Sequence, residues 1–78
     1  MTDGSDGGAG GEQAVRTLWQ LSKDGQTVTC LVVGEPGHEE LRVLMDAEIY
    51  LSEIHTVHDG ALGRATTLRH GFEKHGWT

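Results

Sequence analysis

Between Val15 and His55, apolar residues recur at a period of two, and both alternating sets contain large apolar side chains. This period is typical of β-strands, whose successive side chains point to opposite faces of a sheet. Only one helical pattern follows, and one helix covers only one face of a small sheet. Because a sheet with two apolar faces needs a cover on each, the pattern predicts a partner, most simply a second copy of the chain.

Turn signals divide this region into four expected strands. Asp24-Gly25 is the residue pair typical of a two-residue hairpin turn, 34–37 (Gly-Glu-Pro-Gly) forms a loop, and Asp46-Ala47 occupies a second tight turn. The expected strands are residues 15–22, 27–33, 39–45 and 48–54. Every connection is too short for a parallel crossover, so the sequence predicts a four-stranded antiparallel meander.

The last segment predicts a single helix. Thr56 and Asp59 have the spacing of a capping box at its start. The expected apolar face consists of Ala61, Ala65, Leu68 and Phe72. Gly76 suits the left-handed position after the helix, which would bring Trp77 against Phe72. Gly60 and Gly63 are expected to allow close approach to the strands. The predicted fold class is α+β, in the order β-β-β-β-α, with the helix on one face of the sheet.

Alternation assigns the apolar strand residues to two faces. The face expected to pack on the helix contains Val15, Trp19, Leu21, Val28, Cys30, Val32, Leu41, Val43 and Met45. The second face contains Leu18, Leu31, Val33 and Leu44, with Thr27, Thr29, Arg16 and Arg42 among them. The fourth strand is ambiguous, since Ile49 and Leu51 lie on one side and Tyr50 and Ile54 on the other.

A candidate interface follows from the second face, and its residues are Leu18, Leu31, Val33, Leu44 and Tyr50. Contiguous apolar patches of a few hundred Å² begin to mark interaction sites. Four interpretations stay open: a dimer through this face, a hetero-partner or ligand on this face, a dimer through a sheet edge, and a half-buried β surface with no partner.

The chain has 78 residues and one cysteine, Cys30. A domain of this size buries a modest core and is often stabilised by disulfides, metals or oligomerisation; one cysteine excludes an internal disulfide. Residues 1–13 are rich in glycine and aspartate and are expected to be a disordered tail, with 14–78 as a single domain. We expect no secretory signal, no membrane span and a cytoplasmic location.

The formal charge is −6, and the six Lys and Arg residues are scattered. Nucleic-acid-binding proteins usually carry a basic patch, so this charge disfavours nucleic acid as a partner. The alternative that survives is a single-strand-binding module in which Arg16, Arg42 and Tyr50 line the sheet surface.

Five histidines raise a metal hypothesis, with His55 and His58 at a plausible ligand spacing. At 100° per residue, His58 and His75 flank the apolar stripe of the helix and His70 points to solvent, so these three do not converge. A site made of His55, His58 and a strand carboxylate remains the second alternative. We therefore expect no cofactor and no metal in the leading interpretation.

Catalytic patterns are weak in this chain. The run His38-Glu39-Glu40 follows a Pro-Gly loop and is expected to be a solvated turn. Cys30 is expected in the core, where burial raises the pKa of a thiol. The leading interpretation is a small non-enzymatic module that forms a homodimer and acts by binding another protein.

The chain resembles a group of small bacterial proteins that end in Gly-Trp. The resemblance rests on Leu18-Trp19-x-Leu21, on Asp24-Gly25-x-x-x-Thr29-Cys30 and on the terminal Lys74-His75-Gly76-Trp77, and it covers about residues 17–77. It implies no activity. The β-β-β-β-α order is also similar to the fold of a single-strand-binding transcriptional coactivator, which is dimeric, although the acidic charge argues against the same function.

Overall fold

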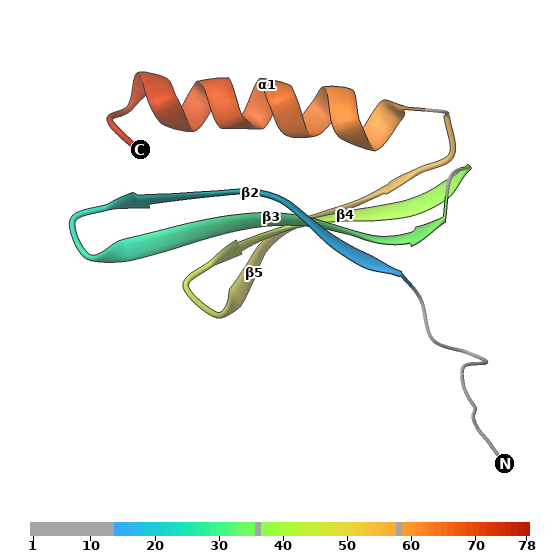
Figure 1. Ribbon diagram of the computed structural model, residues 1–78, viewed down its shortest axis with the longest axis horizontal. Helices are drawn as coiled ribbons and strands as arrows, with labels where there is room; N and C mark the ends of the chain where they lie inside the picture. Colours follow the sequence, from blue (N-terminus) through green and yellow to red (C-terminus); the bar gives the residue numbers. More distant parts are fainter. Residues whose placement is uncertain (1–13, 36, 58) are drawn as a thin grey trace, which may run out of the picture.

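A computed structural model describes residues 14–35, 37–57 and 59–78, so the tail expected at residues 1–13 lies outside the described residues. The strands are β2 (Val15–Lys23), β3 (Gln26–Glu35), β4 (His38–Met45) and β5 (Glu48–His55), and they pair antiparallel in sequence order. The helix α1 (Gly60–Lys74) follows. The predicted α+β meander with one C-terminal helix is confirmed (Figure 1).

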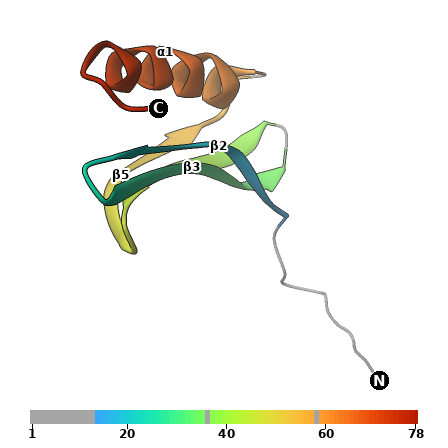
Figure 2. The same ribbon diagram turned by 60° about the vertical axis from the view of Figure 1, so that its left-hand side comes forward.

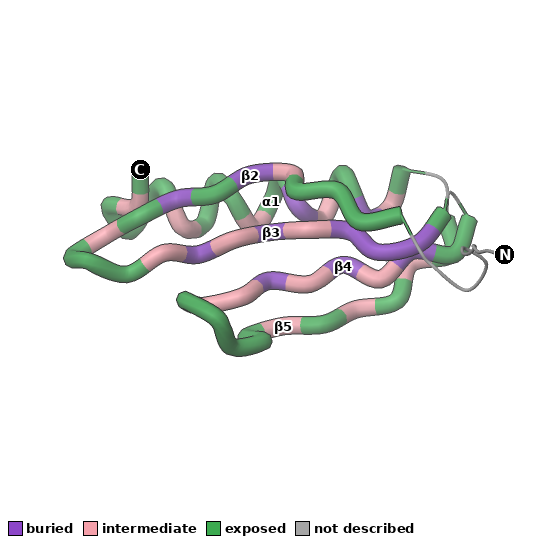
Figure 3. The backbone as a smooth tube through the Cα atoms, turned by 60° about the horizontal axis from the view of Figure 1, so that its bottom comes forward, coloured by how far each residue is buried: buried purple, intermediate pink, exposed green. Residues whose placement is uncertain are grey.

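The helix lies along one side of the sheet, and no described segment packs on the other side (Figures 1 and 2). The core therefore forms between α1 and the face that we call the helix face. Its buried members are Trp19, Leu21, Val28, Cys30, Val32, Leu41, Val43, Ala61 and Ala65. Leu68 and Phe72 pack against them, which confirms the predicted helical stripe. Burial is concentrated in the central strands β3 and β4, whereas the edge strands are mostly exposed or half-buried (Figure 3).

The two hairpin turns are closed by aspartates in the left-handed region. Asp24 and Gly25 have φ of 51° and 82°, as the predicted two-residue turn requires. In the second turn Asp46 alone takes a positive φ, of 57°, and its Oδ1 accepts a hydrogen bond from the Thr27 backbone N–H at 3.1 Å. That bond ties the β4–β5 turn to β3. Ala47 does not take a positive φ, so alanine is tolerated where glycine would be expected.

The end of the helix is the one predicted. Gly76 has φ of 92°, and the N–H groups of Gly76 and Trp77 bond to the carbonyls of Glu73 and Phe72. These two bonds define a Schellman ending. The Trp77 and Phe72 rings meet edge-on with centroids 5.5 Å apart, so the expected contact between C″ and C3 is present.

The start of the helix differs from the prediction. Thr56 is not the cap, because β5 continues to His55, which pairs with Glu39 in β4. Asp59 is the residue before the helix, with φ of 62° and no side-chain capping bond. Gly60 then begins α1 close to the sheet, where an added Cβ would lie 3.3 Å from His55 Nδ1. The close approach expected of the glycines thus holds for Gly60, whereas a Cβ on Gly63 would meet nothing within 4 Å.

Each edge strand contains a β-bulge, and neither was predicted. In β2, Thr17 pairs with Leu31 and Trp19 with Cys30, which leaves Leu18 as the extra residue. In β5, Leu51 pairs with Val43 and Ile49 with Leu44, which leaves Tyr50 as the extra residue. Because one extra residue inverts the alternation beyond it, the bulges decide which side chains reach each face.

Candidate functional site

The side of the sheet opposite α1, which we call the open face, consists of three rows of residues that cross all four strands. Strand register places Val15, Val33, Glu40 and Ile54 in the first row, Thr17, Leu31, Arg42 and Ser52 in the second, and Gln20, Thr29, Leu44 and Ile49 in the third. Two hydrogen bonds on this side agree with the register, from Gln20 to Thr29 and from Ser52 to Glu40. The apolar members of the face are Val15, Leu31, Val33, Leu44, Ile49 and Ile54.

Three of the five predicted interface residues lie on the open face, namely Leu31, Val33 and Leu44. The other two are displaced by the bulges. Leu18 packs against the core and lines a groove beside α1. The ring of Tyr50 lies 6.4 Å from that of Phe72, so Tyr50 also lies on the helix side.

Three residues that were not assigned to the interface take their places. Val15, which was expected on the helix face, pairs with Val33 on the open face. Ile49 and Ile54 also lie on the open face. They would point to opposite faces in a regular strand, but the extra residue Tyr50 between them puts both on the same side. The ambiguous alternation of the fourth strand was the signal of this bulge; we find no corresponding signal at Leu18.

The exposure of these side chains separates the centre of the open face from its edges. Val15, Ile49 and Ile54 are each about 60% exposed, although each is large and apolar. Leu31 and Leu44 are half-buried, and Val33, between Val15 and Glu40 in its row, is buried. Large apolar side chains exposed together on one face are a feature of interaction sites.

A neutral polar network interrupts the apolar surface. Glu40 accepts hydrogen bonds from Arg42 Nη2 at 2.9 Å and from Ser52 Oγ at 2.6 Å. The bond from Arg42, followed by that from Ser52, lowers the pKa of Glu40 to about 2. Arg42 Nε is the one buried side-chain nitrogen or oxygen without a hydrogen-bond partner in the described part of the chain.

The bulge at Leu18 also moves Arg16. It was expected on the second face, but it pairs with Val32 of the helix face and its Nη2 lies 2.9 Å from Glu39 Oε2. Glu39 is 5% exposed and β4 begins at His38. The prediction that His38-Glu39-Glu40 forms a solvated turn is therefore wrong. Glu39 and Glu40 point to opposite faces and do not converge on one substrate position.

The residues of the single-strand-binding alternative do not share one surface. Arg42 lies on the open face and is bonded to Glu40. Arg16 and Tyr50 both lie on the helix side, with Arg16 paired to Glu39 and Tyr50 beside Phe72. The expected basic and aromatic surface is therefore not assembled.

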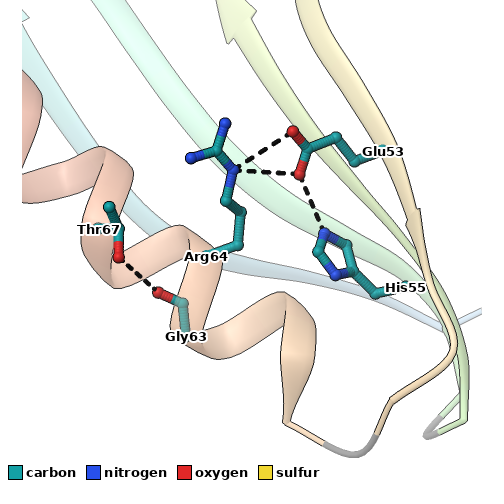
Figure 4. A network of polar contacts seen from close by, with 5 residues as sticks. All are labelled: Glu53, His55, Gly63, Arg64 and Thr67. Atoms are coloured by element: carbon teal, nitrogen blue, oxygen red, sulfur yellow. Dashed lines mark hydrogen bonds and ion pairs between the residues drawn. The ribbon is translucent and has the colours of Figure 1, made fainter.

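The histidine hypothesis concerns the corner where β5 meets α1 (Figure 4). Glu53 Oε1 lies 3.0 Å from His55 Nε2 and 3.2 Å from Arg64 Nε. These contacts, with Arg64 the larger, lower the pKa of Glu53. His58 lies outside the described residues, and among those described no group of three or more His, Cys, Asp or Glu side chains is arranged to hold a metal ion. Because Glu53 lies in β5 and Arg64 in α1, their contact holds β5 against the first turns of the helix.

Cys30 occupies the core position that was predicted. It is 0% exposed, and burial raises the pKa of its thiol to about 11. A thiol with this pKa is almost entirely protonated near neutral pH and is a poor nucleophile.

Two grooves flank α1. The larger, of about 620 Å³, lies beside β2 and is lined by Leu18, Trp19, Leu62, Ala65, Thr66, Arg69, His70 and Glu73. The smaller, of about 260 Å³, lies beside β5 and is lined by Tyr50, Thr67, Leu68, Gly71, Phe72 and His75. The rim of the larger groove is occupied by an ion pair between Arg69 and Glu73, and nothing in either groove specifies a ligand.

The comparisons with known proteins add no assignment: no family profile, no curated protein and no solved structure matches this chain. The resemblance to small proteins ending in Gly-Trp therefore stays a prediction. In the described residues, no helix has the length and apolar character needed to cross a membrane.

Proposed function

We propose that this protein is a small, non-enzymatic interaction module whose open face binds the open face of a second copy. One observation carries the proposal: Val15, Ile49 and Ile54 are each about 60% exposed on a face that no described segment covers. Exposed apolar surface is stabilised when it is removed from water, at about 25 cal/mol per Å². A reduced, buried Cys30 fits a cytoplasmic location for such a module.

The size of the open face supports a dimer. Eight residues per strand at about 3.3 Å each, across four strands spaced about 4.8 Å apart, give a face of roughly 500 Å² per copy. Two such faces bury roughly 1,000 Å² in total, which is about the lower bound for a specific interface. The dimer is therefore expected to be stable at high protein concentration and to dissociate on dilution.

Two alternatives to a face-to-face dimer are weaker. In one the tail of the same chain covers the open face, and in the other a second copy pairs with an edge strand and extends the sheet. Residues 1–13 contain Met1 and Ala9 as their apolar residues, too few to replace water over the face. Both edge strands contain a bulge, a feature that discourages edge-to-edge pairing. The edge of β2 is also occupied at Ser22, whose N–H and C=O bond to Thr78.

The test is the mass of the full-length chain in sedimentation equilibrium, alone and with one charge placed on the open face. We expect the wild type to approach twice 8.4 kDa as its concentration rises, and Ile54→Lys to stay near the monomer mass. Ile54 is exposed in the isolated chain, so lysine there leaves the fold of the monomer intact.

Val57→Lys is the matched control, because Val57 is 71% exposed and lies between β5 and α1 rather than in the sheet. This variant should dimerise like the wild type, and both variants should keep the far-ultraviolet circular dichroism of the wild type. A wild type that stays at 8.4 kDa at every concentration would overturn the proposal.

A further inference from the structure

We infer that the two-fold axis of the dimer runs diagonally across the open face, from Ile54 to Gln20. This inference rests on the proposed dimer and adds how the two copies are oriented. In this orientation Ile54 faces the partner subunit's Ile54, and Val15 faces the partner subunit's Ile49.

The corners of the open face are apolar with one exception. The first row ends at Val15 in β2 and at Ile54 in β5, and the third row ends at Gln20 in β2 and at Ile49 in β5. The two isoleucines and the valine are each about 60% exposed, whereas the fourth corner is the exposed amide of Gln20. An orientation that covers the exposed apolar surface must therefore match three apolar corners and one polar corner.

The open face is nearly square, which permits a diagonal axis. Its four strands span about 14 Å, since neighbouring strands lie about 4.8 Å apart. From the first row to the third, β4 advances from Glu40 to Leu44, which is about 13 Å at about 3.3 Å per residue. A diagonal two-fold axis exchanges these two directions, so the strands of the two copies cross at about 90°, one of the two usual ways in which sheets pack.

Three of the four axes that suit a square face give mismatched corners. The axis must lie in the plane of the interface, because an axis normal to a face cannot bring that face onto itself. An axis along the strands puts Gln20 opposite the partner subunit's Ile49, and an axis across the strands puts it opposite the partner subunit's Val15. The diagonal from Val15 to Ile49 puts Gln20 opposite the partner subunit's Ile54. Each of these buries an amide against an apolar side chain, which costs free energy.

The diagonal from Ile54 to Gln20 pairs like with like. All three exposed apolar corners of each copy then meet apolar corners, which removes them from water. Gln20 meets the partner subunit's Gln20, and the two amides exchange hydrogen bonds across the axis. The Gln20 Nε2 group has two N–H donors, of which one bonds to Thr29 Oγ1 at 2.9 Å, so the second serves the partner.

The polar residues beside Ile54 also meet polar neighbours about this axis. Glu40 lies next to Ile54 along the first row, and Ser52 lies next to Ile54 along the face of β5. Because a diagonal axis exchanges rows with strands, Glu40 approaches the partner subunit's Ser52. The carboxylate therefore meets a hydroxyl group rather than a second carboxylate.

The experiment places one cysteine at each apolar corner and joins the copies with a short bismaleimide. Facing sheets lie about 10 Å apart, whereas neighbouring corners of one face lie a further 13–14 Å or so apart in the plane, so the reagent joins opposed corners. The native Cys30 is 0% exposed and does not react. We expect Ile54→Cys alone to form a covalent dimer about tenfold faster than Val15→Cys alone or Ile49→Cys alone, because opposed thiols meet at a millimolar effective concentration. A mixture of Val15→Cys and Ile49→Cys should also cross-link.

Each of the other axes predicts a different pattern of cross-links. The axis along the strands joins Val15→Cys to Ile54→Cys, the axis across the strands joins Ile54→Cys to Ile49→Cys, and the other diagonal joins Val15→Cys to itself. Any of these patterns would overturn the inference while leaving the proposed dimer intact. Val57→Cys is the control, because Val57 is exposed outside the sheet and should not cross-link. A wild type that stays a monomer in sedimentation equilibrium would instead overturn the proposed function.

Discussion

The two faces of the sheet use the same strands but differ in what covers them. On the helix face Val28, Cys30, Val32 and Leu41 are completely buried, and on the open face Val15, Ile49 and Ile54 are about 60% exposed. Each face carries one Glu–Arg pair from neighbouring acids of β4, Glu39 with Arg16 and Glu40 with Arg42. The comparison shows that the single helix covers the face with more apolar residues and leaves the six apolar residues of the open face without a cover among the described segments.

The same comparison explains why the edge strands are irregular. A regular β2 would put Leu18 on the open face and Val15 on the helix face, and a regular β5 would separate Ile49 from Ile54. The bulges move Leu18 and Tyr50 towards α1 and collect Val15, Ile49 and Ile54 on the opposite side. The open face therefore gains Val15 and Ile49 in exchange for Leu18 and Tyr50, which become two more side chains that pack on the helix side.

The largest expected effect compares a leucine on each face. Leu41→Ala removes a completely buried side chain and should lower the free energy of unfolding by about 2–5 kcal/mol, whatever the protein concentration. Leu44→Ala, on the open face and half-buried, should cost less in dilute solution. If a second copy covers the open face, the cost of Leu44→Ala rises with concentration. Urea unfolding at several concentrations measures both; equal costs for the two variants in dilute solution would contradict the assignment of the faces.

The next effect tests the attachment of the helix to β2. Trp19 Nε1 donates a hydrogen bond to the Ala65 carbonyl at 3.0 Å, inside the core. Trp19→Phe removes that bond and the contacts of the larger ring and should cost about 1–3 kcal/mol, although the Ala65 carbonyl keeps its hydrogen bond within the helix. Thermal and urea unfolding would measure the loss. A change below the error of the method would mean that α1 does not depend on this contact.

A smaller effect is expected from the ion pair on the helix face. Arg16→Met leaves the buried Glu39 carboxylate without its partner, but Arg16 is itself 50% exposed, so we expect a loss of about 1–2 kcal/mol, below that for a fully buried pair. Arg69→Met is the control, because it breaks an exposed pair with Glu73 worth about 0.3–0.5 kcal/mol. Equal losses in urea unfolding would show that the burial of Glu39 has no energetic consequence.

The smallest expected effect is a dependence of stability on acidity. Hydrogen bonds lower the pKa of Glu40 to about 2 and also lower that of Glu53. A carboxyl group with a lowered pKa in the folded state stabilises the fold fully above its ordinary pKa of 4.5, and this contribution is lost as pH falls towards the folded value. The urea midpoint should therefore fall between about pH 4.5 and pH 2. The double variant Glu40→Gln/Glu53→Gln should show a flatter decline, and an unchanged slope would contradict the role of these two groups.

Much of the fold was predictable because local signals were strong. Asp24-Gly25 fixed the first hairpin, period-two patterning gave four strands, and Gly76 with Trp77 gave the helix end. The helix start was not predictable from Thr56 and Asp59, because pairing of His55 with Glu39 in β4 competes with the capping box. Of the candidate interface, Leu31, Val33 and Leu44 lie in central strands, where pairing on both sides keeps the alternation regular. Leu18 and Tyr50 lie in edge strands, where pairing on one side tolerates an extra residue.

The sequence by itself determined that this chain forms a four-stranded meander with one helix and that apolar residues remain for a second face. Those conclusions depend on turn chemistry and periodicity, which act over a few residues. Only the tertiary structure decided which residues occupy each face, because the bulges at Leu18 and Tyr50 invert the alternation through pairing with strands distant in the sequence. The pairing of Arg16 with Glu39 follows from that register.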